Sequence, residues 1–231
     1  MDTTRLAVVI GGRGGIGAAL GEALLSHPDY DRVISLSRRS TPVIDFAEPE
    51  TIAIAAGWLS DQPGEVRLVI DATGFLHDDT FSPERSLRDL DPEHMQKAFA
   101  INAIGPALLM KHVLPLLPRE GRSVFATLSA RVGSIEDNRL GGWHSYRASK
   151  SALNQFVRGA AIELGRKRKS AVCVALHPGT VDTPLSQPFA KSGLDVRPAT
   201  QAAAEIMAVI DGLTPAQTGG FFDHKGESIP F

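Results

Sequence analysis

Short apolar runs alternate along the chain with longer segments whose apolar residues recur at helical spacing. The apolar runs are Leu6 to Ile10, Arg32 to Leu36, Arg67 to Asp71, Ser123 to Leu128 and Ala171 to Leu176. The helical segments are Ile16 to Ser26, Glu93 to Leu117, Tyr146 to Leu164 and Gln201 to Leu213. Strands that alternate with helices build βαβ units. The pattern therefore predicts an α/β fold, a doubly wound parallel sheet of Rossmann type with helices on both faces.

The same pattern predicts one domain. No repeat, low-complexity tract or linker divides the 231 residues, and this length is enough for one substantial core. Residues 184–198 have a proline at each end and little periodicity. We expect this segment to form a loop or lid rather than a domain boundary.

Composition narrows the class of protein. The chain is 43% hydrophobic and 22% charged, as in soluble globular proteins, and its formal net charge is −2. No basic field indicates a nucleic acid or an anionic membrane as partner. The basic run Arg166 to Lys169 lies where a helix is predicted to end, so it complements the helix dipole.

Cysteine and histidine usage gives further expectations. Cys173 is the single cysteine and lies in an apolar strand, which excludes an intramolecular disulfide and fits a reducing cytoplasm. The chain begins without a signal-peptide pattern, and no uninterrupted apolar run approaches the length of a membrane span. The seven histidines lack metal-ligand spacing, so we expect no metal site.

A glycine-rich turn follows the first predicted strand directly. Gly11, Gly15 and Gly17 frame the turn, which also contains Arg13 and Ile16 and leads into a helix. Glycines there leave backbone amides bare at the positive end of a helix, where a pyrophosphate binds. Because the turn stands between a strand and a helix, we interpret it as a nucleotide site rather than a simple tight turn.

The residues at the end of the second strand indicate which nucleotide this site binds. A carboxylate at this place would hold the ribose hydroxyls of NAD, but the sequence reads Ser37, Arg38, Arg39. Arginine binds phosphate through paired, charge-assisted hydrogen bonds, which suits a 2′-phosphate. The sequence therefore predicts NADP(H) in preference to NAD(H), although two surface arginines would give the same pattern.

Tyr146 and Lys150 form a candidate catalytic pair. Four residues apart on a predicted helix, their side chains lie on one face. A nearby ammonium favours the phenolate and lowers the pKa of tyrosine, so the hydroxyl can exchange a proton with a substrate oxygen. Taken alone, this spacing also fits a solvated helix face.

With these features in sequence order, the chain resembles the short-chain dehydrogenase/reductase family over nearly its whole length. Asp45 and Phe46, at the end of a short third strand, are similar to the family's adenine-contacting Asp and its neighbour. The run Asp71 to Gly74, with Ala72, resembles the family's Asn-Asn-Ala-Gly motif. Asn102 resembles the helix asparagine that links the catalytic lysine through water to a proton path. Pro178, Gly179, Val181 and Thr183 resemble the segment that holds the nicotinamide carboxamide.

The runs Ser129 to Ile135, Gly141 to Trp143 and Gly220 to Asp223 resemble the carbonyl-reductase branch that contains sniffer-type and C-factor-like proteins. Three positions depart from the family pattern. Ile10 replaces the threonine before the glycine turn, and Asp71 replaces an asparagine, which we expect to affect strand bracing. Ala130 occupies the place of the catalytic serine, so Ser129 or Ser134 would have to serve, or Tyr146 would carry more of the polarisation, or the site is impaired.

The leading hypothesis is a cytoplasmic NADP(H)-dependent oxidoreductase that transfers hydride between nicotinamide and a small carbonyl or alcohol substrate. Tyr146 would act as general acid/base, with Lys150 and Asn102 as its partners. The alternative is a cofactor-binding signalling or sensor protein with little or no turnover. The alanine at position 130, in place of the catalytic serine, favours this alternative. By resemblance to the family, we expect a homodimer or homotetramer that pairs through the helices bearing Asn102 and Tyr146. Phe221 and Phe222 could close the substrate pocket or anchor the tail, and we favour anchoring.

Overall fold

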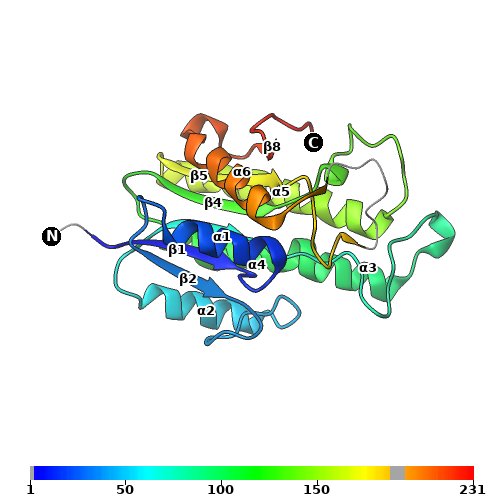
Figure 1. Cartoon of the computed structure of the whole chain (residues 1–231), viewed down its shortest axis with the longest axis horizontal. Helices are drawn as coiled ribbons and strands as arrows, with labels where there is room; N and C mark the ends of the chain where they lie inside the picture. Colours follow the sequence, from blue (N-terminus) through cyan, green and yellow to red (C-terminus); the bar gives the residue numbers. More distant parts are fainter. Residues whose placement is uncertain (1–2, 188–195) are drawn as a thin grey trace.

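The computed structural model describes residues 3–187 and 196–231. A six-stranded parallel sheet lies at its centre, with strand order β2-β1-β3-β4-β5-β8 (Figure 1). Its strands are β1 Arg5–Ile10, β2 Arg32–Leu36, β3 Glu65–Asp71, β4 Ser123–Leu128, β5 Ala171–His177 and β8 Phe221–Asp223. A second, two-stranded sheet pairs β6 Thr180–Val181 with β7 Val196–Arg197. The predicted doubly wound parallel sheet is confirmed.

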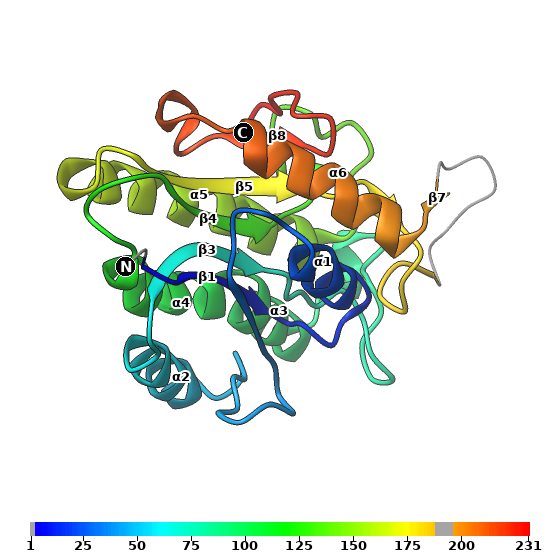
Figure 2. The ribbon, with the colours of Figure 1, turned by 60° about the vertical axis from the view of Figure 1, so that its left-hand side comes forward.

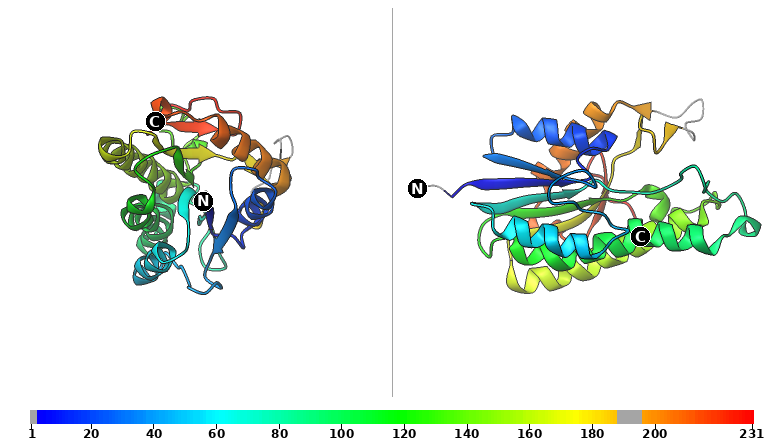
Figure 3. Two further views of the ribbon diagram at one scale, coloured as in Figure 1. Left: turned by 90° about the vertical axis from the view of Figure 1, so that its left-hand side faces the viewer. Right: turned by 90° about the horizontal axis from the view of Figure 1, so that it is seen from below.

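Helices cover both faces of the large sheet. One side carries α1 and α6, and the other carries α2, α4 and α5, as Figure 2 and the end-on and lower views of Figure 3 show. The helices are α1 Gly15–Leu25, α2 Glu50–Ser60, α3 Pro92–Phe99, α4 Gly105–Val113, α5 His144–Lys167 and α6 Ala199–Gly212. Short 3₁₀ turns occupy Leu87–Asp89, Leu114–Leu116, Arg131–Gly133 and Pro215–Gln217. Arg166 and Lys167 fall in the last turn of α5, as the sequence predicts.

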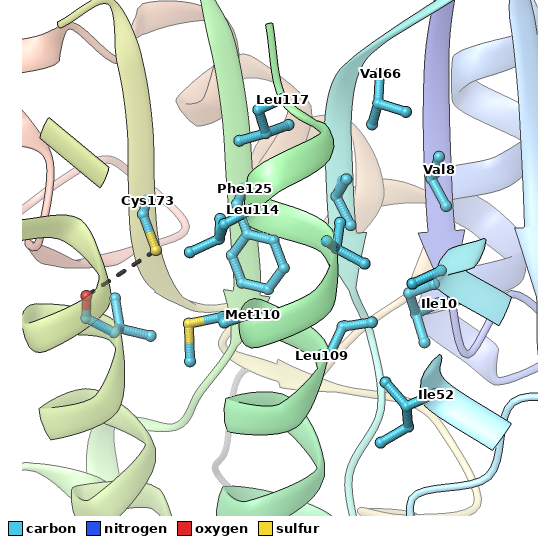
Figure 4. Close-up of a cluster of buried hydrophobic side chains, with 14 of the residues drawn as sticks. Val8, Ile10, Ile52, Val66, Leu109, Met110, Leu114, Leu117, Phe125 and Cys173 are labelled. Carbon is cyan, nitrogen blue, oxygen red and sulfur yellow. Dashed lines mark hydrogen bonds between the residues drawn. The ribbon is translucent and has the colours of Figure 1, made fainter. Parts of the chain in front are cut away.

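Two buried layers hold the sheet between the helices. Successive strand residues point to opposite faces, so Val8 packs on the side of α2, α4 and α5, whereas Ala7 packs with α1 and α6. Figure 4 shows the first layer, where Phe125 and Cys173 are fully buried. The sulfur of Cys173 lies 4.0 Å from the carbonyl oxygen of Val157, and burial raises the pKa of this thiol to about 12. Cys173 is therefore a packing residue.

The expected short third strand at Asp45 and Phe46 is wrong. This segment is a loop that folds back on the end of β2: Ile44 N donates to Ser37 O at 3.1 Å, and Ser40 Oγ donates to Pro42 O at 2.6 Å. These local bonds replace a ladder with β2, and Pro42 has no amide hydrogen to offer one. Helix α2 was not predicted, because its alanine-rich run lacks a strong amphipathic pattern.

The long helix predicted over Glu93 to Leu117 is interrupted. A π-helical turn, Ala100–Ile104, separates α3 from α4, and Asn102 lies within it. π-Helical turns are rare in proteins, and those that occur are often found at functional sites. By length and mean hydropathy (1.4), Pro92–Leu116 could cross a membrane. Part of its apolar surface packs into the core, where Ala98, Leu109 and Val113 are buried.

The C-terminal tail and the end of the predicted 184–198 loop each form a short strand. Phe221 and Phe222 are buried in β8, which the sequence reading did not recognise as a strand, and this placement confirms their anchoring role. Most of the predicted loop or lid, residues 188–195, lies outside the described residues. At its end, Val196–Arg197 forms β7, so the loop prediction is wrong at those two residues.

Candidate active site

The glycine turn lies between β1 and α1, at the carboxyl edge of the sheet. Gly14 N donates to Gly11 O at 2.8 Å, and a Cβ on Gly17 would lie 2.3 Å from Gly11 O, so only glycine fits there. Helix α1 begins without a side-chain cap at its N-terminus. Its first amides are therefore left for an acceptor from outside the helix, as an anion site requires. Ile16, by contrast, packs against the core.

The segment from Pro178 to Thr183 reaches the same turn. A Cβ on Gly15 would lie 2.7 Å from Thr183 Cγ2. Gly179 has φ of 78°, and a Cβ there would meet the Arg197 guanidinium at 1.9 Å, so this position also requires glycine. Arg197 is held by Glu205 at 2.7 Å. The segment after β5 thus lies over the start of α1, although the two are far apart in sequence.

Three guanidinium groups are exposed near this edge. Arg13, Arg38 and Arg39 are exposed and form no ion pair within residues 3–187 and 196–231. Ser37 Oγ accepts from Arg39 N at 3.2 Å, which fixes the turn that displays them. Asp45 is partly buried in the following loop. Phe46 is buried and packs on Gly105, where a Cβ would lie 2.4 Å from its ring, so its side chain belongs to the core.

The run from Asp71 to Gly74 meets both the glycine turn and the helix residues. A Cβ on Gly11 would lie 3.1 Å from the Ala72 carbonyl. At Gly74, a Cβ would lie 3.8 Å from Asn102 Oδ1 and 3.9 Å from Lys150 Nζ. Residues predicted to bind a nucleotide and residues predicted to act in catalysis therefore share one edge of the sheet.

Asp71 braces the strands. Its carboxylate is fully buried and accepts from Thr127 Oγ1 at 2.8 Å and from Thr73 Oγ1 at 2.7 Å. Burial raises the pKa of Asp71, while these bonds and the charge of Lys150 partly oppose the rise. The hydrogen bond from Thr127 of β4 agrees with the bracing role expected from the sequence.

Asn102 connects three segments. Its Oδ1 accepts from Phe75 N at 2.7 Å, and its Nδ2 donates to Phe75 O at 2.7 Å and to Ser149 Oγ at 3.1 Å. Ser149 Oγ in turn donates to Tyr146 O at 2.9 Å. The amide thus ties the segment after β3 to the helix that carries Tyr146.

Tyr146 and Lys150 lie on one face of α5, as predicted. Lys150 is buried, its Nζ donates to Leu128 O at 2.8 Å, and it lies 5.9 Å from the centroid of the Tyr146 ring. Burial lowers the pKa of Lys150 to about 8, and the charge of Asp71 opposes this shift. The pKa of Tyr146 is raised to about 12 by desolvation. The predicted lowering of the tyrosine pKa by Lys150 is not met, because desolvation dominates and the phenol stays protonated at neutral pH.

The two candidate serines are both engaged elsewhere. Ser129 is buried and its Oγ donates to Asn154 Oδ1 at 2.7 Å. Ser134 is buried and its Oγ accepts from Asp137 N at 3.1 Å. Ala130 is only partly buried and lies two residues beyond Leu128, whose carbonyl holds Lys150. A Cβ on Gly133 would lie 2.8 Å from Lys150 Cβ, so the turn after Ala130 packs directly against the helix at Lys150.

Two buried residues beside α5, Glu84 and His94, were not predicted from the sequence. Glu84 is 2% exposed and His94 is 3% exposed, and His94 Nδ1 lies 3.4 Å from Glu84 Oε1. No sequence signal pointed to them: Ser145, a typical capping residue, stands directly before Tyr146, and only the structure shows that the N-cap position belongs to Trp143, which makes no side-chain capping bond.

Comparisons with known proteins show which family the chain belongs to. The family model described as Enoyl-(Acyl carrier protein) reductase matches residues 25–213. C-signal of Myxococcus xanthus is 37% identical over 146 residues, covering 63% of this chain and 84% of that protein. Short-chain dehydrogenase srdF of Neurospora crassa is 30% identical over an alignment of 254 residues, covering 99% of each chain.

Solved structures agree at the level of the fold. An NADPH-bound carbonyl reductase from chicken fatty liver has a TM-score of 0.84, and carbonyl reductase Sniffer of D. melanogaster has 0.82. Each is 22% identical, with 100% of both chains covered. The chain belongs to the short-chain dehydrogenase/reductase family, whose members are oxidoreductases that use a nicotinamide cofactor and small-molecule substrates. The predicted family is confirmed, and C-signal bears out the likeness to C-factor-like proteins.

Proposed function

We propose that this protein is an NADP(H)-dependent reductase of small carbonyl compounds, with Tyr146 as the general acid. The observation that carries the proposal is the junction at Gly74. There the backbone of a predicted nucleotide-binding motif lies close to both Asn102 Oδ1 and Lys150 Nζ. A hydride donor bound along this edge would be next to the side chains that handle the proton.

The residues around the edge suit a dinucleotide. The uncapped start of α1 and the turn from Gly11 to Gly17 would take the pyrophosphate. Arg38 and Ser37 would take a 2′-phosphate, together with Arg13, since the glycine turn is bonded to the end of β2 through Gly12 N and Leu36 O. The NADPH in the chicken carbonyl reductase structure supports the same choice. Asp45, Ala72, Val181 and Thr183 remain predicted contacts, as do Pro178 and Gly179.

When bound, the nicotinamide supplies or receives a hydride at the substrate carbon. In the direction of reduction, Tyr146 donates its phenolic proton to the carbonyl oxygen, and the product is an alcohol. A pKa of about 12 keeps Tyr146 protonated, which is the form that reduction needs. Lys150 holds the opposite charge near the phenolate that remains, and Asn102 fixes the segment on which both depend.

The direct test is oxidation of NADPH, followed by absorbance with a panel of aldehydes, ketones and diketones. Titrations of NADPH and NADH in the absence of substrate accompany it. We expect turnover with at least one carbonyl class and tighter binding of NADPH than of NADH. Binding of neither nucleotide would contradict the proposal.

Arg38→Gln tests the cofactor preference. We expect the Kd for NADPH to rise about 10- to 100-fold, as for the loss of a charge-assisted hydrogen bond, with the Kd for NADH unchanged. Arg32→Gln is the matched control because it removes the same charge at the opposite end of β2, where Arg32 contacts Gln62. Fluorescence titration measures both constants. Equal losses for the two nucleotides would show that Arg38 does not read the 2′-phosphate.

Asp71→Asn tests the electrostatics of Lys150. The carboxylate of Asp71 raises the pKa of Lys150 against the lowering by burial. Without this charge, Lys150 loses its proton at a lower pH. We therefore expect the alkaline limb of the pH profile of kcat/KM to move below about 8, the pKa of Lys150 in the wild type. Asp137→Asn removes a carboxylate that pairs with Arg131 and should leave the limb in place.

A second candidate function is a nucleotide-binding signalling protein with little turnover. Ala130 favours it, since alanine cannot donate a hydrogen bond to a carbonyl oxygen, and so does the similarity to a protein named C-signal. Tight NADPH binding without turnover on the whole panel would favour this reading. Asn102, Tyr146 and Lys150 favour the enzyme, because binding alone needs no proton donor.

We also propose a homodimer or homotetramer. Ile104, Phe156 and Ile162 are apolar and about half exposed on the outer side of the helices that carry Asn102 and Tyr146. A cytoplasmic location and the absence of nucleic-acid and membrane partners remain predictions. Among the described residues, no cluster of three or more His, Cys, Asp or Glu side chains could hold a metal ion.

A further inference from the structure

The catalytic helix begins without a cap of its own. Its N-cap residue is Trp143, which has φ of 50° and makes no side-chain capping bond, and two left-handed glycines, Gly141 and Gly142, precede it. Ser, Thr, Asp or Asn normally accepts a hydrogen bond from the first turn. Tryptophan cannot accept one, so the first amides of α5 need an acceptor from elsewhere.

Glu84 supplies that acceptor from 61 residues earlier in the chain. Ser145 N lies 3.2 Å from Glu84 Oε2 and 3.3 Å from Oε1, and Ser145 Oγ donates to Oε1. The main-chain oxygen of Glu84 also accepts from Trp143 N at 2.5 Å. A carboxylate at a helix N-terminus stabilises the helix through its dipole, and burial strengthens the effect.

The carboxylate is itself held in place. His94 Nδ1 lies 3.4 Å from it, and the His94 ring stacks on Phe81, with centroids 5.1 Å apart and 4° between planes. The loop that runs from Phe75 to Glu84 is fixed at its start by two hydrogen bonds between Asn102 and the backbone of Phe75. Because a buried carboxylate is costly without such partners, this arrangement marks a built contact rather than chance proximity.

We propose that Glu84 is a positioning residue for Tyr146. Tyr146 directly follows Ser145 and is the third residue of α5, so movement of the first turn moves the phenol. General acid catalysis requires the phenol within hydrogen-bond reach of the carbonyl oxygen. Misplacement by about 1 Å can cost about 10²-fold in rate. The inference rests on the proposed function, in which Tyr146 is the proton donor.

Three variants test the contact: Glu84→Ala, Glu84→Gln and Ser145→Ala. We expect Glu84→Ala to lower kcat by about 10²-fold while the Kd for NADPH stays unchanged, since Glu84 is not among the residues proposed to bind the nucleotide. Glu84→Gln should recover part of the loss because its amide oxygen still accepts from Ser145 N. If both side chains act through one contact, adding Ser145→Ala to Glu84→Gln should cost less than the product of the single effects.

Asp223→Asn is the control. Asp223 is another buried carboxylate, but it binds Arg131 and the amides of Lys225 and Glu227 in the tail. We expect its kcat to change less than about twofold. Hydrogen exchange provides a second readout: the amides of the first turn of α5 should exchange faster in Glu84→Gln, and those of β4 should not.

The outcomes separate the two proposals. An active wild type whose folded Glu84 variants keep the wild-type kcat would overturn the positioning role alone. Strictly multiplicative effects of Glu84→Gln and Ser145→Ala would also overturn it, and this comparison remains decisive if Glu84→Ala fails to fold. A wild type that binds NADPH but reduces no carbonyl compound would overturn the proposed function, and the positioning role would fall with it.

Discussion

Replacing Tyr146 with phenylalanine is expected to lower kcat for carbonyl reduction by about 10²- to 10⁴-fold, the usual contribution of general acid catalysis. The substitution removes one hydroxyl and keeps the ring that packs against Trp143, with centroids 6.2 Å apart. Folding should therefore be preserved. NADPH oxidation under saturating substrate measures the loss, and circular dichroism measures the fold.

The chain provides a matched control, since it contains two tyrosines. Tyr30→Phe removes the same hydroxyl from a residue that packs beside His27, against the α1 and α6 layer. Its kcat should equal that of the wild type. Retention of more than about a tenth of the activity by Tyr146→Phe would mean that another group donates the proton, and the proposed mechanism would be wrong.

Ala130→Ser is expected to raise kcat by about 10²-fold. The new hydroxyl would stand two residues beyond Leu128, which anchors Lys150, at a partly buried position. One preorganised donor to a developing oxyanion contributes about 10²- to 10³-fold. The effect should appear in kcat more than in KM, because the bond is strongest in the transition state. Steady-state kinetics of the two proteins with one substrate make the comparison.

Two further variants make this result specific. Ala148→Ser adds the same hydroxyl on the exposed side of α5 and should leave kcat unchanged. Ser129→Ala asks whether the wild type already has a donor: because Ser129 Oγ is bound to Asn154, we expect a small effect. A large loss in Ser129→Ala, with no gain in Ala130→Ser, would assign the donor role to Ser129 instead.

Much of the fold could be predicted because its signals are local. The β-branched runs of β1, β2 and β4 and the periodicity of α5 and α6 reflect burial that repeats with the period of each element. The segments that escaped prediction lack such a pattern. Helix α2 is rich in small apolar residues, and β8 has three residues. The strand expected at Asp45 is absent because nearby turns satisfy its backbone groups.

In the candidate site, too, features that depend on local spacing could be predicted, whereas contacts between distant segments could not. Covalent spacing alone placed Tyr146 and Lys150 on one helix face, and strand order brought Gly11, Gly74 and Asn102 to one edge. The sequence could not show that the Ser129 hydroxyl points toward Asn154, because Asn154 lies on another element. It also could not give the raised pKa of Tyr146, which results from desolvation of the phenol in the folded chain.

By itself, the sequence determined the parallel α/β fold, the glycine turn at the start of α1 and the Tyr146–Lys150 pair. Each of these depends on residue spacing within one element or on the order of elements, which the chain encodes directly. Only the tertiary structure decided which serines are engaged, that Phe46 belongs to the core, and that Glu84 caps the catalytic helix. Those features depend on burial and on contacts between distant segments, because charge, solvation and hydrogen-bond partners are set by neighbours in space.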